Sequence, residues 1–129
     1  MLAIDTNVIV RFLTRDHPEQ SEKARALIAK EMVFVATTVL LETEWVLRYS
    51  YRFRQADIVG RLAAFIGLPN VTVEDSVVTA RAFAGMAAGM DFADALHLTS
   101  AAECDAFVSF DARLAKAARG LGGLEVRAP

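Results

Sequence analysis

Four acidic side chains occupy positions at which the amino-acid sequence could assemble a metal-dependent catalytic centre. Asp5 and Asp111 each follow a short apolar segment, and Glu42 and Asp94 each lie near the start of a predicted helix. Carboxylates gathered without compensating charge repel one another, and each is driven to take up a proton. A divalent cation removes that penalty, and an all-oxygen set with no Cys or His ligand spacing suits Mg²⁺ or Mn²⁺ rather than Zn²⁺.

The elements that must position these carboxylates alternate along the chain between strands and helices. We predict strands at residues 1–4, 32–36, 71–73, 106–109 and 124–126, and helices at about 8–13, 19–30, 37–51, 55–66, 75–88, 91–103 and 111–119. This alternation indicates an α/β domain with a central short parallel sheet of four to five strands, flanked by helices on both faces. Ligands of such sheets gather at the carboxyl ends of the strands, where these acids lie.

Composition bounds the class of protein. The 129 residues suit one domain over 1–129, and 54% hydrophobic residues exclude a disordered chain. We expect no membrane span, because the longest apolar runs are far shorter than the roughly 20 residues that a spanning helix needs. The beginning of the chain lacks a secretory pattern, and a single cysteine, Cys104, permits no internal disulfide. These features predict a cytoplasmic protein.

Each aspartate also has a purely structural interpretation. Asp5, Asp91 and Asp111 could cap the helices that follow them, and Asp94 is a favourable acid for a first helical turn. Asp91 is the better cap of the pair three residues apart, so Asp94 is the first candidate ligand and Asp91 a further one. Taken singly, the capping interpretation is the stronger for each residue. Their joint placement at strand ends favours a metal site.

The two glutamates of the predicted helix 37–51 are separated by their neighbours. Glu44 has Arg48 four residues later, which favours a surface ion pair. Glu42 has Val46 at that spacing and no local cation. A carboxylate without a partner on an apolar face is costly unless a cation binds it, so we expect Glu42 to be the metal ligand.

Four short motifs, in order, resemble those of the PIN-domain nucleases and, within them, the VapC-type toxins of bacterial toxin–antitoxin pairs. The motifs are Ile4-Asp5-Thr6-Asn7, Leu40-Leu41-Glu42 followed by Trp45-Val46-Leu47, Asp91-Phe92-Ala93-Asp94-Ala95-Leu96-His97, and Val108-Ser109-Phe110-Asp111. The match extends over essentially the whole chain. Ser109 stands where the family usually has threonine. His97 stands where an aliphatic residue is more common, and we expect it to pack in the core.

The resemblance implies a single PIN-like domain and Mg²⁺- or Mn²⁺-dependent cleavage of RNA, with 5′-phosphate and 3′-hydroxyl products. Asp5, Glu42, Asp94 and Asp111 would be the catalytic metal ligands, with Asp91 as a further candidate. Thr6, Asn7 and Ser109 would orient carboxylates, water or phosphate. Clustered carboxylates that hold cations can activate water for attack on a phosphodiester.

Basic residues among aromatic ones at residues 48–54 are typical of a surface that neutralises phosphate and stacks on unpaired bases. Candidate RNA-binding residues are Arg48, Arg52, Arg54 and Arg113; the alternative is a solvated helix end with the rings in the core. By resemblance, we also expect a homodimer that binds a cognate antitoxin. The apolar residues of segment 8–13 are a candidate partner surface.

Other classes remain open to comparison. A phosphatase of the haloacid-dehalogenase type needs a second acid two residues after the first, where Asn7 stands, and a receiver domain needs paired N-terminal acids. A PIN nuclease without a toxin role and a catalytically silent binding module are the remaining alternatives. The net charge of −2 does not exclude nucleic acid, because setting the four proposed ligands aside leaves 12 acidic residues against 14 Lys and Arg, a balance of +2.

Overall fold

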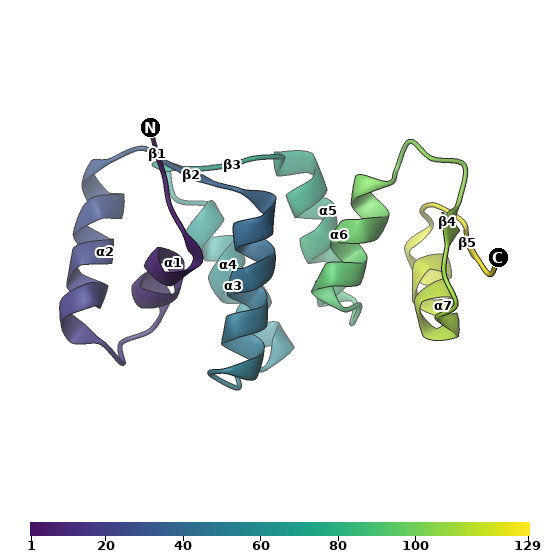
Figure 1. Cartoon of the computed structure of the whole chain (residues 1–129), viewed down its shortest axis with the longest axis horizontal. Coiled ribbons are helices and arrows are strands. Elements are labelled where there is room, and N and C mark those ends of the chain that lie inside the picture. Colours follow the sequence, from purple (N-terminus) through teal and green to yellow (C-terminus); the bar gives the residue numbers. More distant parts are fainter. The chain divides into compact units, whose positions relative to one another are not determined.

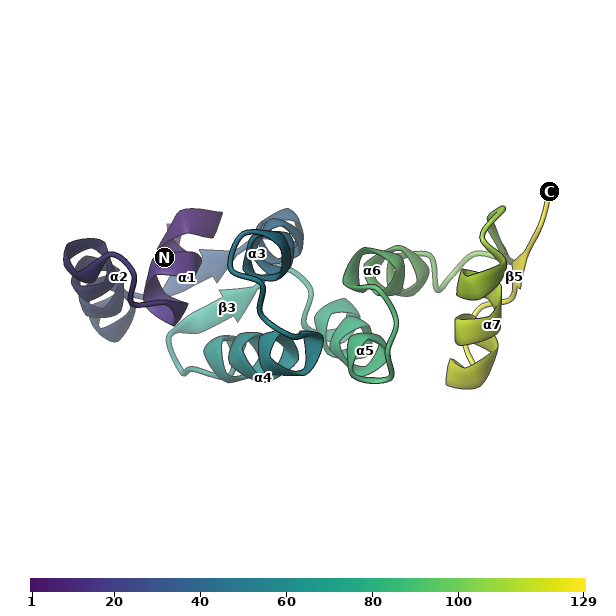
Figure 2. The ribbon, with the colours of Figure 1, turned by 90° about the horizontal axis from the view of Figure 1, so that it is seen from below.

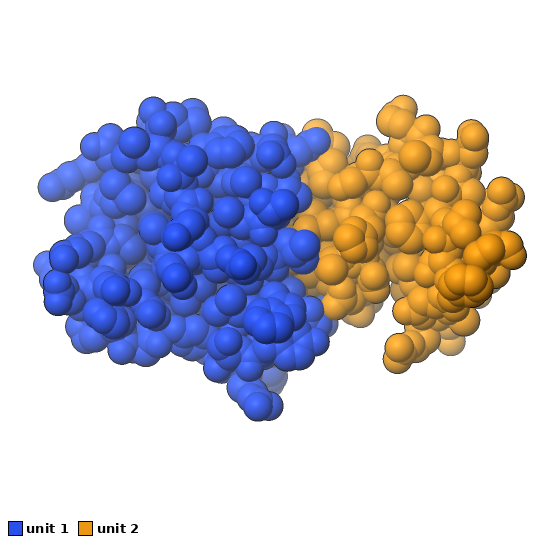
Figure 3. Space-filling model, viewed as in Figure 1, with its two compact units in different colours: residues 1–76 blue, residues 77–129 orange.

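The computed structural model describes all 129 residues and has an α/β fold of seven helices and five short strands. It divides into two compact units, unit 1 (Met1–Ser76) and unit 2 (Val77–Pro129), which are coloured separately in Figure 3. The units are described one at a time below. The prediction of a single domain over 1–129 stays a prediction.

Unit 1 contains a parallel three-stranded sheet in the order β1-β2-β3 (Figure 1). Leu2 pairs with Val33, which in turn pairs with Val71. Figure 2 shows β3 passing between α4 and the α1 and α3 helices. The elements of this unit are β1 (Leu2–Ala3), α1 (Thr6–Leu13), α2 (Pro18–Lys30), β2 (Val33–Val35), α3 (Thr37–Tyr49), α4 (Gln55–Ile66) and β3 (Val71–Val73).

The core of unit 1 forms where helices α1, α3 and α4 bury one stripe each. The apolar residues with no exposed surface are Ile9, Val33, Val35, Leu40, Leu47, Ile58 and Leu62. In α3, the buried residues Leu40, Thr43, Glu44 and Leu47 follow the spacing of one helical face. This stripe sets the rotation of α3 about its axis, and so decides which acidic residue of the helix meets solvent.

Unit 2 contains α5 (Ser76–Ala87), α6 (Phe92–Ser100), β4 (Phe107–Val108), α7 (Ala112–Leu121) and β5 (Val126–Arg127). Strands β4 and β5 pair in parallel, with Phe107 opposite Val126. The predicted α/β fold with short parallel strands is confirmed, and the five strands are divided between a sheet of three and a sheet of two. Apolar runs mark strands, but pairing depends on contacts between distant segments, and these strands are only two or three residues long.

Most predicted boundaries agree with the structure within a few residues. Helix α3 begins without a side-chain cap, because its N-cap residue is Ala36, which makes no side-chain hydrogen bond. Instead, the backbone N–H of Thr37 donates to the Glu74 carboxylate at 3.4 Å. A side chain 37 positions along the chain thus satisfies a helix-terminal donor that a local cap would otherwise serve.

None of the helices combines the length and the apolar character that crossing a membrane requires.

Candidate active site

Asp5 begins helix α1 and lies at the end of the chain segment that leaves β1. It is the N-cap residue, and its Oδ1 atom accepts a hydrogen bond from the backbone N–H of Val8 at 3.2 Å. The side chain is exposed. The capping interpretation of Asp5 is therefore correct, and it does not compete with metal binding, because the cap engages one of the two carboxylate oxygens.

The assignments of Glu42 and Glu44 to an apolar face and to the surface were reversed. Glu44 is buried, with 1% of its surface exposed, whereas Glu42 is exposed. Glu44 falls on the stripe with Leu40 and Leu47, whose packing carries it inward. Its predicted partner is correct: Arg48 Nε lies 2.9 Å from Glu44 Oε1, and Arg48 Nη2 donates to Oε2 at 3.2 Å.

Glu42 remains the candidate metal ligand of α3, but the reason is now its exposure to solvent and not an unpaired position on an apolar face. The carboxylate of Glu44 is engaged by a guanidinium inside the fold, so it cannot also face a substrate. Glu42 is open to solvent, where a hydrated cation or a phosphate can reach it. Of the two glutamates, Glu42 is still the one able to act as a ligand.

Two of the candidate aspartates in unit 2 are the N-cap residues of helices. Asp91 caps α6 by accepting from the backbone N–H of Asp94 at 3.2 Å. Asp111 caps α7 by accepting from the N–H groups of Arg113 and Leu114 at 2.9 and 3.3 Å. Asp94 caps nothing: it lies in the first turn of α6 and is half-buried.

The electrostatics of Asp94 set it apart from the other acids. Burial raises the pKa of its carboxyl above the usual value of 3.8, and the charge of Asp91 raises the pKa further. Asp111 acts in the same direction, whereas His97 lowers the pKa. Asp91 and Asp111, which cap two different helices, therefore both lie close enough to Asp94 to repel its carboxylate.

His97 does not pack in the core, as was expected from its place among apolar residues. It is exposed, whereas Ala95 and Leu96 just before it are buried. The helical turn places His97 one turn beyond Asp94, where its charge favours the ionised carboxylate. The error arose because the apolar pair 95–96 marks the buried face and His97 lies outside it.

The three polar residues expected to orient the site occupy different surroundings. The hydroxyl of Ser109 accepts a hydrogen bond from the backbone N–H of Asp111 at 3.0 Å, so it helps to hold the start of α7. Thr6, the first residue of α1, is buried, and Asn7 beside it is exposed. Of the three, Ser109 has a direct contact with a candidate ligand.

The donor set fits a divalent metal by its chemistry. Every candidate atom is a carboxylate oxygen, which Mg²⁺ and Mn²⁺ prefer. The mutual repulsion that raises the pKa of Asp94 is also what a bound cation relieves. No group of three or more His, Cys, Asp or Glu side chains is already arranged to hold a metal ion. Asp5 and Glu42 belong to unit 1, and Asp91, Asp94 and Asp111 to unit 2.

The basic segment after α3 is largely occupied with internal contacts. The Tyr51 hydroxyl donates to Asp16 at 2.7 Å, which lowers the pKa of Asp16. Phe53 is half-buried, with the guanidinium of Arg61 4.6 Å from its ring centroid. These two rings are therefore held by the fold rather than presented for stacking.

The four arginines proposed to bind RNA differ in how free they are. Arg48 is ion-paired to Glu44, and Arg54 lies 3.5 Å from an exposed Asp57 carboxylate. Arg52 is exposed, as is Arg113, whose Nε lies 3.9 Å from Asp111 Oδ1. Arg48 thus has the ion pair that its spacing from Glu44 predicted, and this pair gives it a structural role in α3.

The candidate partner surface on α1 is mostly covered. Ile9 is fully buried, and Phe12 is half-buried with its ring in an edge-to-face contact with Phe65 at 5.2 Å between centroids. The guanidinium of Arg25 covers Phe12 at 4.9 Å. This segment packs against α2 and α3 and was wrongly expected to leave a large apolar surface.

Trp45 and Phe110 are exposed rings that were not proposed for binding from the sequence, whereas Tyr49 lies in the segment 48–54 that was expected to stack on bases. Trp45 and Tyr49 of α3 are each 54% exposed, and Phe110, next to Asp111, is 90% exposed. A spacing of four residues on an exposed helix face signals that Trp45 and Tyr49 are neighbours.

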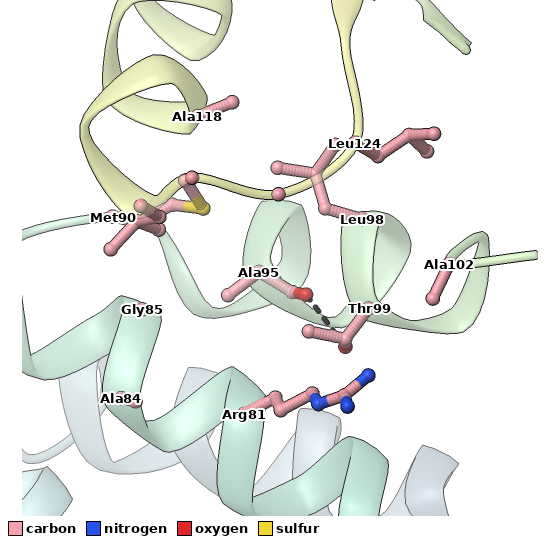
Figure 4. Close-up of a pocket in the computed structure, with 13 residues that line it drawn as sticks. Arg81, Ala84, Gly85, Met90, Ala95, Leu98, Thr99, Ala102, Ala118 and Leu124 are labelled. Carbon is pink, nitrogen blue, oxygen red and sulfur yellow. Dashed lines mark hydrogen bonds between the residues drawn. The ribbon is translucent and has the colours of Figure 1, made fainter. Parts of the chain in front are cut away.

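A cavity of about 640 Å³ lies within unit 2 and is lined mainly by apolar residues (Figure 4). None of the candidate metal ligands lines it. Its walls come from α5, α6, α7 and the segment after α7, and they include Met90, Leu98 and Leu124. The Thr99 hydroxyl donates to the Ala95 carbonyl at 2.8 Å, so one of its few polar groups is already satisfied. The cavity contains no acidic residue.

The model of the PIN domain family matches residues 2–120, which include every candidate ligand. No curated protein matches the chain.

Proposed function

Because the chain belongs to the PIN-domain family, whose members are generally metal-dependent nucleases, we propose that it is an endoribonuclease that hydrolyses RNA phosphodiester bonds with Mg²⁺ or Mn²⁺. The proposed catalytic metal ligands are Asp5, Glu42, Asp94 and Asp111, with Asp91 as a further ligand. RNA is the proposed substrate because the four motifs resemble those of the VapC-type members.

The observation that carries the proposal is the match to the PIN family over residues 2–120, which include every proposed ligand. The surroundings of Asp94 agree with it, because burial and the like charges of Asp91 and Asp111 raise the pKa of its carboxyl. Burying a carboxylate beside like charges does not help the fold, and carboxyl groups with pKa values perturbed in this way concentrate at functional sites. A bound cation would convert this repulsion into attraction.

In the proposed reaction, Asp5, Glu42, Asp94 and Asp111 would hold a divalent cation, which would activate a water molecule and offset negative charge on the phosphate. The chain's own residues position the carboxylates. The cap contacts fix Asp5 on the first turn of α1 and Asp111 on the first turn of α7. Ser109 holds the backbone of Asp111 through its hydroxyl, so the Asp111 carboxylate keeps one orientation.

We further propose that the protein is the toxin of a toxin–antitoxin pair, acting in the cytoplasm by cutting an RNA that translation requires. The support is the resemblance of the motifs over the whole chain. A homodimer and a cognate antitoxin are the partners that this role implies. Exposed apolar side chains of unit 1, such as Met1, Leu2 and Met32, are available for protein contact. A PIN nuclease without a toxin role and a silent binding module are the alternatives.

The test is cleavage of single-stranded RNA by purified protein in Mg²⁺, in Mn²⁺ and in a chelator, with Asp5→Asn and Asp94→Asn as variants. Asparagine caps a helix as well as aspartate does, so Asp5→Asn removes the charge and keeps the cap. We expect metal-dependent cleavage that both variants abolish, while Glu22→Gln, an exposed carboxylate of α2, cleaves normally. Undiminished cleavage by both aspartate variants would refute the assignment.

The toxin role has its own test. Expression should arrest growth, and co-expression of a partner encoded beside the gene should relieve the arrest. Normal growth on expression of a protein that cleaves RNA in vitro would leave the nuclease without the toxin role.

A further inference from the structure

The exposed face of α3 carries three side chains in line. Glu42, Trp45 and Tyr49 lie at positions i, i+3 and i+7, which share one side of a helix. All three are exposed, and the span from Glu42 to Tyr49 is about 10 Å along the helix axis. An aromatic surface therefore extends along the helix from the carboxylate proposed to bind metal.

The two rings form a prearranged pair. Their centroids are 5.0 Å apart at an interplanar angle of 42°, and each residue keeps 54% of its surface exposed. The guanidinium of Arg48 lies 4.8 Å from the Tyr49 ring centroid. Because buried Glu44 holds Arg48 by an ion pair, the cation and the ring it contacts are anchored to the core.

We propose that Trp45 and Tyr49 form a stacking site for an unpaired base of the RNA substrate, an inference that rests on the proposed function and extends it. Exposed aromatic faces that the fold holds in place are the chemistry that stacks on unpaired bases. The site takes any base, because every base has a π-face, so it favours single-stranded over paired RNA.

Other occupants fit these residues less well. The centres of protein–protein interfaces are rich in aromatic residues and Arg but depleted of Glu, whereas Glu42 lies on the same helix face as the two rings. Tyr51 and Phe53 are half-buried and do not offer a free face for stacking. The Tyr51 hydroxyl bonds to Asp16, and the Arg61 guanidinium lies over the Phe53 ring. Trp45 and Tyr49 are the exposed aromatic pair of α3, and they lie beside Glu42.

Trp45 is the only tryptophan of the chain, so its fluorescence reports directly on stacking. The Asp94→Asn protein, which should not cleave, is titrated in Mg²⁺ with an oligoadenylate and with an abasic oligonucleotide of the same length. We expect saturable quenching by the oligoadenylate and none by the abasic chain, which presents the same phosphates without bases. Equal quenching by both, or by neither, would overturn the proposal.

Variants then measure the contribution of each ring. Binding of a fluorescein-labelled oligoadenylate, followed by anisotropy, does not depend on the tryptophan. By this measure Trp45→Ala and Tyr49→Ala should each weaken binding by about 5- to 150-fold, the range for loss of a stacked base. Trp45→Phe and Tyr49→Phe keep a ring and should recover most of the affinity. Val77→Ala, an exposed apolar control on α5, should bind normally. Because both positions are exposed, circular dichroism should show the fold retained.

The outcomes separate this inference from the nuclease proposal. If wild-type protein cleaves RNA and both alanine variants cleave with unchanged KM, the stacking site is wrong and the nuclease stands. If base-dependent quenching occurs but no condition gives cleavage, the stacking site stands and the nuclease is wrong. If the alanine variants change the oligomeric state by light scattering while RNA affinity is unchanged, the face is an interface between copies and the proposal is overturned.

Discussion

Replacing Arg48 with methionine should lower the free energy of unfolding by about 3 kcal/mol, because it strands a buried carboxylate. Glu44 is 1% exposed, and both of its oxygens lie within 3.2 Å of the Arg48 guanidinium. Removing one partner of a buried ion pair typically costs about 3–5 kcal/mol. The lower end applies here because Arg48 keeps 29% of its side chain exposed, so water already screens part of the pair.

Urea unfolding of matched variants measures this cost. Glu44→Gln in the Arg48→Met protein should recover more than half of the loss, because a buried amide costs less than a buried unpaired charge. The two changes are therefore expected to be strongly non-additive in a double-mutant cycle. Arg54→Met is the control: that side chain is 87% exposed and its partner Asp57 is 52% exposed, so the change should stay within about 0.5 kcal/mol.

The reasoning is refuted if Arg48→Met loses less than about 1 kcal/mol at an unchanged m-value, or if the two substitutions add. The same result would return Arg48 to the set of arginines available for RNA. A stability loss without a specific loss of RNA affinity in the folded protein would instead place Arg48 in the framework of α3.

Gly60→Ala should stabilise the protein by about 0.5–1 kcal/mol, because a Cβ there meets nothing within 4 Å and alanine favours the helix. Gly85→Ala should destabilise it by about 1–2 kcal/mol, since the new Cβ would lie 3.1 Å from the Cβ of Ala95; equal thermal shifts in the two variants would contradict this. Burial and neighbouring carboxylates raise the pKa of Asp94, so without metal its contribution to stability is full at low pH and is lost as the pH rises through that raised pKa. Asp111→Asn should lower the pKa of Asp94 in a carboxyl NMR titration, and an unmoved pKa would show that the two do not interact.

Local patterns predicted the helix starts that carry the acids. Asp5, Asp91 and Asp111 were each expected as possible caps, and each accepts the backbone hydrogen bonds of an N-cap. This succeeds because a cap involves residues three positions apart at most, which a single sequence displays. The alternation of strands and helices likewise predicted the order of the elements.

What the local patterns could not give are contacts between distant segments. Glu74 serves the start of α3 from 37 positions away, a role that no neighbouring residue signals. The partition of the strands into two sheets is also a matter of long-range pairing. Glu44 differs, because the stripe containing Leu40 and Leu47 was visible in the sequence and already indicated a buried face.

The most direct test of the proposed metal ligands is the affinity of the purified protein for Mn²⁺, measured by calorimetry without RNA. We predict that Asp94→Asn weakens Mn²⁺ binding by at least tenfold, about the smallest effect seen when even an outer contact of a metal site is lost. Glu22→Gln, which removes the charge of an exposed carboxylate on α2, should bind as the wild type does. Equal Mn²⁺ affinity in the wild-type and Asp94→Asn proteins would contradict the assignment of Asp94 as a metal ligand.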